Sequence, residues 1–297
     1  RYTLRQAMRR MLTADRFLAQ LFVRLPSMLR TPLRSRSQAP GRSGPRLPQA
    51  RYVAHNERMS EQPAARRTRG RTAQRGSHFG PGLFDFLRAL AAHNNRVWFD
   101  AHRDAYERDV RGPMLAFISD LGPRLKEVSA FILADPRPQG GSMFRIYRDT
   151  RFAKVKAPYK TNVGAQFRHT LASCDVHAPG FYLHLAPDDV YGGGGLWHPE
   201  PAALAKVRAR IVDKPTEWRT VLRGGLVIEG DTLKRPPTGF DPAHPHIEHL
   251  KLKDLYTGAE LTEADACRHD FLDRYVEVCQ RAAPLLRFLC RGLELPW

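Results

Sequence analysis

The sequence predicts an α+β domain, in which a small antiparallel sheet packs with N-terminal and C-terminal helices behind a disordered Arg-rich extension. Apolar residues recur at helical spacing from residue 83 to residue 125. The period then shortens towards two between residues 143 and 185, and helical spacing returns after residue 200. The connections within the middle part are short, which favours antiparallel pairing of its strands.

The N-terminal quarter differs sharply in charge from the rest. Residues 1–80 hold 18 Arg, no Lys and 3 acidic residues, whereas residues 81–297 hold 30 Lys and Arg against 27 Asp and Glu. Residues 31–78 are rich in Arg, Pro, Ser and Gly, and they bury too little apolar surface to offset chain entropy. We therefore predict a largely disordered extension over 1–80 and a single α+β domain over 81–297.

Residues 4–30 of the extension have the spacing of a basic amphipathic helix, and three interpretations of this region stay open. The first interpretation is an organelle-targeting presequence, because such segments are Arg-rich and poor in acids. The second is an arm that binds nucleic acid or a membrane surface. The third is that the region is translated from upstream of the true start, which would lie near Met59.

The helical spacing and the stop signals predict individual elements. Asn94 and Asn95 separate two of the first helices, and Pro113 begins the third. Thr262 and Asp265 form a capping-box pattern that starts a long closing helix, with a kink at Pro284. The predicted helices cover residues 83–90, 97–110, 113–125, 201–211, 216–223 and 262–286, the predicted strands cover 143–148, 163–170 and 181–185, and residues 225–260 are predicted to be irregular.

Cysteine usage and hydropathy indicate the class of protein. The four cysteines are widely spaced and none forms a C-x-x-C pair, which argues against a disulfide framework and a zinc site. No run approaches about 18 consecutive apolar residues, so no membrane span is predicted. These features favour a cytoplasmic protein.

Residues 142–162 contain the strongest functional signal. Six cations are set against one acid, Asp149, and aromatic residues are interleaved with them. Cations on a folded scaffold either pair with acids or face an anionic ligand, and guanidinium forks suit phosphate. The predicted ligand-binding residues are Arg145, Arg148, Arg151, Lys156 and Lys160, with Tyr147 or Tyr159 stacking on a base or sugar ring. The alternative is that these cations pair with acids on the nearby helices, namely Asp104, Glu107, Asp109 and Asp120.

Four glycines, Gly192 to Gly195, precede a predicted helix start. Backbone amides at such a start bind anions, and glycine allows the anion to approach closely. Gly193, Gly194 and Gly195 are therefore predicted to bind the ligand, with His198 as the acid or base if a reaction takes place. The alternative is a structural turn with Trp197 in the core.

Residues 241–249 include Asp241, His244, His246 and His249, which invites comparison with a metal cluster. The spacing lacks the i,i+4 pair of zinc hydrolases, and Pro245 prevents a regular helix. No metal site is predicted, and the sequence assigns no cofactor.

Several motifs together resemble those of the domain of unknown function 2461, a family of bacterial and fungal proteins. The resemblance covers roughly residues 82–291 and implies a single compact domain of a soluble protein, without assigning catalytic residues. Ala153 departs from the serine-like residue expected after Arg-Phe. The motifs are Phe84 to Leu87 with Asn94 to Phe99, Phe144 to Phe152 with Lys156 to Thr161, Gly193 to Pro199, and Pro237 to Asp241 with His244 and Pro245.

The function predicted from these residues is binding of a small anionic, phosphorylated ligand in a basic pocket. Whether group transfer or hydrolysis follows is left open. Two alternatives from other classes are a non-catalytic nucleic-acid-binding protein and a structural or interaction domain. The near-neutral charge of residues 81–297 counts against nucleic acid as the partner.

Overall fold

The computed structural model describes residues 76–151, 156–172 and 177–297. The predicted extension, the proposed start at Met59 and the departure at Ala153 lie outside the described residues. The described residues belong to one compact unit, and no helix among them is long and apolar enough to cross a membrane.

The first helices follow the predicted pattern closely. They are α2 (Pro81–Ala92), α3 (Arg96–Ala101), α4 (Arg103–Tyr106), a π-helical turn η1 (Glu107–Arg111) and α5 (Gly112–Val128). Asn95 caps α3, because its side chain accepts a hydrogen bond from the amide of Trp98. The predicted stop and restart at the two asparagines is confirmed.

The sheet is a four-stranded antiparallel meander in the order β1-β2-β3-β4. Its strands are β1 (Val163–Arg168), β2 (Gly180–Ala186), β3 (Asp189–Leu196) and β4 (Leu255–Leu261). The register places Gly192 of β3 between Leu183 of β2 and Ala259 of β4. The predicted α+β class with an antiparallel sheet is confirmed, and the strands predicted at 163–170 and 181–185 are present as β1 and β2.

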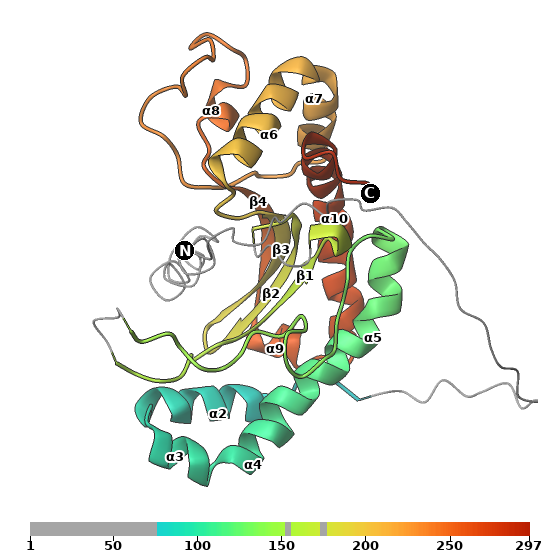
Figure 1. Ribbon diagram of the computed structural model, residues 1–297. Coiled ribbons are helices and arrows are strands. Elements are labelled where there is room, and N and C mark those ends of the chain that lie inside the picture. Colours follow the sequence, from blue (N-terminus) through green and yellow to red (C-terminus); the bar gives the residue numbers. More distant parts are fainter. Residues whose placement is uncertain (1–75, 152–155, 173–176) are drawn as a thin grey trace, which may run out of the picture. The chain divides into compact units, whose positions relative to one another are not determined.

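The remaining helices lie around the end of β3 and along the sheet. They are a 3-10 turn η2 (Thr170–Ala172), α6 (Pro201–Asp213), α7 (Pro215–Arg223), α8 (Ile247–Leu250), α9 (Glu263–Ala266) and α10 (Phe271–Gly292). Figure 1 shows α5 and α10 running beside the sheet, with α6 to α8 grouped at one end. Helix α10 joins two hydrophobic clusters, because Tyr275 packs in the cluster of the sheet and Leu289 packs in that of α6 and α7.

The predicted glycine turn before a helix is wrong, because Gly193, Gly194 and Gly195 lie inside the central strand β3. These three glycines pair with β2 on one side and with β4 on the other. The glycines are needed for close packing: a Cβ atom on Gly194 would lie 2.7 Å from the Leu286 side chain of α10. Helix α6 begins only at Pro201.

Two further predictions require correction. The region 225–260, predicted to be irregular, contains α8 and the start of β4, whose pairing with β3 overrides a weak local pattern. The capping box at Thr262 is confirmed, but it caps only the short helix α9. The chain then turns, and α10 begins at Phe271, whose ring is buried against Phe79 and Phe117.

Candidate functional site

The cationic segment forms a two-stranded ribbon beside β1. We call residues 142–148 and 156–160 together the cationic ribbon, and residues 142–148 are its outer segment. The amide of Arg148 donates a hydrogen bond to the carbonyl of Pro158 at 2.8 Å, and the outer segment also runs alongside β1. The predicted strand over 143–148 is therefore extended and antiparallel but irregular.

The irregularity has a simple geometric cause. Two isolated bridges join the outer segment to its neighbour, one between Met143 and Ala165 and one between Tyr147 and Tyr159. Between these bridges the outer segment takes four residue steps, from 143 to 147, whereas the chain that faces it takes six, from 159 to 165. The partner therefore bulges, and the regular ladder is interrupted.

The outer edge of the ribbon offers backbone donors. Arg148 and Lys160 make the hydrogen bonds that flank the Tyr147–Tyr159 bridge, so this bridge is a non-hydrogen-bonded pair. The amides of Arg145 and Tyr147 consequently point away from the neighbouring strand. Within the described residues, no backbone carbonyl accepts from either amide.

Two of the predicted cations hold the loop of the ribbon together. The Arg151 guanidinium donates to the Asp149 carboxylate, with a shortest distance of 2.6 Å. The pKa of Asp149 is lowered to about 2, mainly by this hydrogen bond and to a lesser extent by the charge of Arg145. The Lys156 ammonium donates to the carbonyl of Thr150 at 3.0 Å.

Arg145 and Arg148 are not paired with the helix acids that the alternative interpretation named. Neither side chain makes an ion pair within the residues that the structure covers, and Arg145 is exposed. Three of the four acids contact other side chains: Glu107 pairs with Arg111, Asp109 pairs with Arg108, and Asp120 lies 3.0 Å from the His78 Nε2 atom. The structure thus contradicts the pairing alternative for these two arginines.

Arg148 and Lys160 are the most shielded cations of the ribbon. The Arg148 Nε atom is buried and has no hydrogen-bond partner in the described part of the chain. Lys160 is only 7% exposed, and its ammonium lies 5.2 Å from the centre of the Phe144 ring. Antiparallel pairing places these two cations on the same side of the ribbon, because both are one residue from the Tyr147–Tyr159 bridge.

Tyr159, predicted to stack on a ligand, lies in the core. It is 2% exposed, and its ring stacks on Phe99 at a centroid distance of 4.2 Å. Asn94 fixes its backbone, because the Asn94 amide donates to the Tyr159 carbonyl and its oxygen accepts from the Tyr159 amide, both at 3.0 Å. The sequence marked Asn94 only as a helix stop and missed this role in positioning the ribbon.

His198 lies at another part of the sheet. Its amide donates to the buried Asp254 carboxylate at 2.7 Å, and its φ of 44° is in the left-handed region. Strand residues advance about 3.3 Å each, so the five steps from Tyr191 to Leu196 alone span roughly 16 Å. The charge of Lys160 acts on His184, whose ring stacks on Tyr191 near the start of β3, whereas His198 follows the end of β3.

His184 on β2 is a buried titratable group whose pKa is influenced by a cation of the ribbon. Its ring stacks on Tyr191 at 4.6 Å, and its Nδ1 atom lies 3.1 Å from the Tyr182 hydroxyl. Burial lowers the pKa of His184 to about 3, and the positive charge of Lys160 acts in the same direction. These contacts show that His184 is a packing and hydrogen-bonding residue of β2.

The histidines of residues 244–249 pack against one another. The His244 Nδ1 atom accepts from the amide of His246 at 3.1 Å, and the rings of His246 and His249 lie 6.1 Å apart. Burial lowers the pKa of both His246 and His249. Within the described residues, no three potential ligands gather as a metal site would require.

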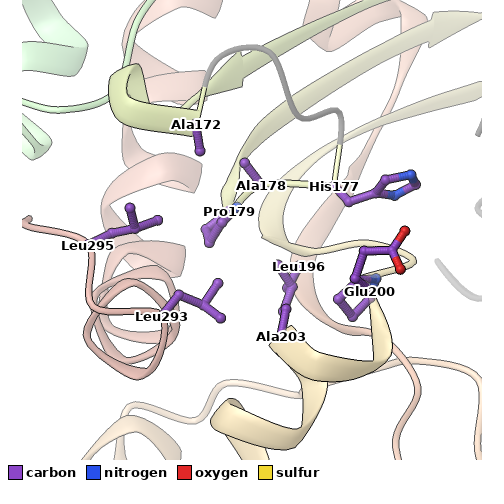
Figure 2. Close-up of a pocket in the computed structure, with 10 residues that line it drawn as sticks. Ala172, His177, Ala178, Pro179, Leu196, Glu200, Ala203, Leu293 and Leu295 are labelled. Atoms are coloured by element: carbon purple, nitrogen blue, oxygen red, sulfur yellow. The ribbon is translucent and has the colours of Figure 1, made fainter. Parts of the chain in front are cut away.

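A separate cavity of about 200 Å³ lies between the start of β2, the start of α6 and the segment after α10 (Figure 2). None of the predicted site residues lines it. Among the described residues, His177 and Glu200 are the lining residues whose side chains carry charged or titratable groups. The remaining walls are apolar, which does not suit an anion. These walls consist of Ala172, Ala178, Pro179, Leu196, Pro199, Ala203, Leu293 and Leu295.

Comparison with known proteins bears on the whole described domain. The model of one family, a conserved hypothetical protein (DUF2461), matches residues 82–288, which include all of the ribbon, the sheet and most of α10. No curated protein matches the chain. The match spans more than half of the sequence and agrees with the motifs in the helices, the ribbon and β3, and the chain therefore belongs to the DUF2461 family.

Proposed function

We propose that the cationic ribbon binds a small anionic, phosphorylated ligand at its outer edge. The side chains of Arg145 and Arg148 flank this edge, and the amides of Arg145 and Tyr147 point towards it. Guanidinium groups and backbone amides together provide the donors that phosphate oxygens accept. Lys156 and Lys160 add positive charge on the inner segment.

The buried Nε atom of Arg148 is the observation that carries the proposal. A shielded donor without an acceptor costs free energy, and the cost is larger when the group is charged. An anion at the outer edge would supply the missing acceptor. Arg151 supports the site indirectly, since its ion pair with Asp149 fixes the backbone that directly follows the outer segment.

The proposal is confined to binding. Transfer or hydrolysis with His198 as acid or base stays a prediction, because His198 follows the end of β3 whereas Lys160 acts on His184 beside the start of that strand. The amides of Gly193, Gly194 and Gly195 are likewise engaged in the sheet. Nucleic-acid binding through the Arg-rich extension stays a prediction, and steep salt dependence with oligonucleotides would be its signature.

Isothermal titration of the full chain with pyrophosphate and with ribose 5-phosphate tests the proposal. Arg148→Ala removes a charged donor, so we expect the affinity to fall about 10- to 100-fold. Arg268→Ala is the matched control, because Arg268 is ion-paired with Asp270 outside the ribbon, and it should bind like the wild type. Absence of binding by the wild type, or equal losses in both variants, would refute an anion site at the ribbon.

A further inference from the structure

Tyr147 is an exposed aromatic residue at the centre of the outer segment. It is 46% exposed, and among the described residues it is the only Phe, Tyr or Trp in the exposed class. Large aromatic rings contribute to stability mainly when they are buried, so the exposure of a ring between two arginines requires an explanation. Tyr159, its partner across the ribbon, is fully packed and offers no free ring face.

The Tyr147 ring is held in place rather than projecting alone. Its centroid lies 5.4 Å from that of Tyr159 and 6.3 Å from that of Phe99. The Arg103 guanidinium, which is hydrogen-bonded mainly to Asp100, also interacts with the Tyr147 hydroxyl. A ring fixed at its edge and at its hydroxyl loses little further entropy when another ring stacks on it.

The ring and the proposed anion site share one edge of the ribbon. Arg145 is two residues from Tyr147, and in an extended backbone such residues lie on the same side. Arg148 follows Tyr147 directly, so its side chain leaves the same segment on the opposite side. A ligand whose anionic group contacts these arginines therefore has the Tyr147 ring beside it.

From this arrangement we propose that the ligand is a nucleotide, with its phosphate at Arg145 and Arg148 and its base stacked on Tyr147. The inference rests on the proposed function, because it adds a ring to the phosphate already assigned to the ribbon. Every nucleobase has a π-face, so stacking gives affinity without selecting one base. The structure assigns the class of nucleotides and no particular base.

Titration calorimetry with three probes separates the two proposals. The probes are adenosine 5′-monophosphate, ribose 5-phosphate and adenosine, and the protein is the full chain as wild type, Tyr147→Leu and Tyr147→Phe. We expect the wild type to bind the nucleotide about 5- to 100-fold more tightly than ribose 5-phosphate, which is the range of one base stack. Tyr147→Leu should remove this advantage and leave ribose 5-phosphate unaffected, whereas Tyr147→Phe should retain it.

Each other outcome has a distinct meaning. If ribose 5-phosphate and the nucleotide bind equally well to the wild type, the nucleotide inference is overturned and the anion site stands. If Tyr147→Leu weakens both probes equally, the residue acts on the ribbon and not on a base, which also overturns the inference. If neither phosphate binds, the proposed function fails and the inference fails with it.

Discussion

The cationic ribbon and the glycine-rich strand β3 both have the sequence pattern of an anion site, but the fold uses their backbones differently. In β3 the sheet takes up both edges of the strand, because β2 and β4 pair with it on either side. In the outer segment of the ribbon, only one edge is paired with other described residues, and the amides of Arg145 and Tyr147 lie on the other edge. The comparison shows that a glycine run binds an anion only if its amides are left unpaired by secondary structure.

Replacing a glycine of β3 is the strongest test of this difference. A Cβ atom on Gly193 would meet the backbone carbonyl of Thr257 in β4, which has no freedom to move away. We expect Gly193→Ala to destabilise the protein by about 3 kcal/mol or more, measured by urea unfolding. Gly76→Ala, where the added Cβ meets nothing within 4 Å, should change the stability by less than about 0.5 kcal/mol. Equal stability of the two variants would show that β3 tolerates side chains and is not closely packed there.

The two tyrosines of the ribbon allow the same comparison between single side chains, one buried and one exposed. Tyr159→Ala removes a buried ring from the stack with Phe99, so we expect a loss of about 3 kcal/mol in unfolding free energy. Tyr147→Ala removes a half-exposed ring and should cost about 1 kcal/mol or less. Similar losses for both variants would contradict the division between a structural tyrosine and one available to a ligand.

The pH dependence of stability tests the same comparison through one buried titratable group, His184. The unfolded chain protonates His184 near its ordinary pKa of about 6.5, whereas the folded protein keeps the imidazole neutral down to a pKa of about 3. The unfolded state therefore binds more protons in this window, and stability should decrease as the pH falls from about 6.5 towards 3. His184→Gln should flatten this part of the urea-unfolding profile.

Lys160 provides a control that links this effect to the ribbon. Its charge helps to keep His184 neutral, so Lys160→Met should raise the pKa of His184, followed through the imidazole signals in NMR spectra. An unchanged pKa would mean that burial alone sets the titration of His184 and that the ribbon does not act on β2 electrostatically.

The helices were predictable where local chemistry determines them. Asn95 caps α3 and Thr262 caps α9, and both signals depend on side chains within three residues of the cap. The lengths were less predictable, since the turn after α9 follows from burial of Phe271 against rings that are distant in the sequence. The strands β3 and β4 were missed because neither has a clear alternation, and each is stabilised by its neighbours.

The features of the candidate site can likewise be separated into those set by the local sequence and those set by tertiary contacts. By itself the sequence determined the α+β class and the cluster of cations in residues 142–162, because residue type fixes charge and hydrogen-bonding capacity. The tertiary structure decided which of these groups are available. It buried Tyr159 and exposed Tyr147, and it placed the glycines inside the sheet. Within the part of the chain that the structure describes, it paired Arg151 with Asp149 and left Arg148 without an acid. Availability depends on contacts between distant segments, and no local pattern contains that information.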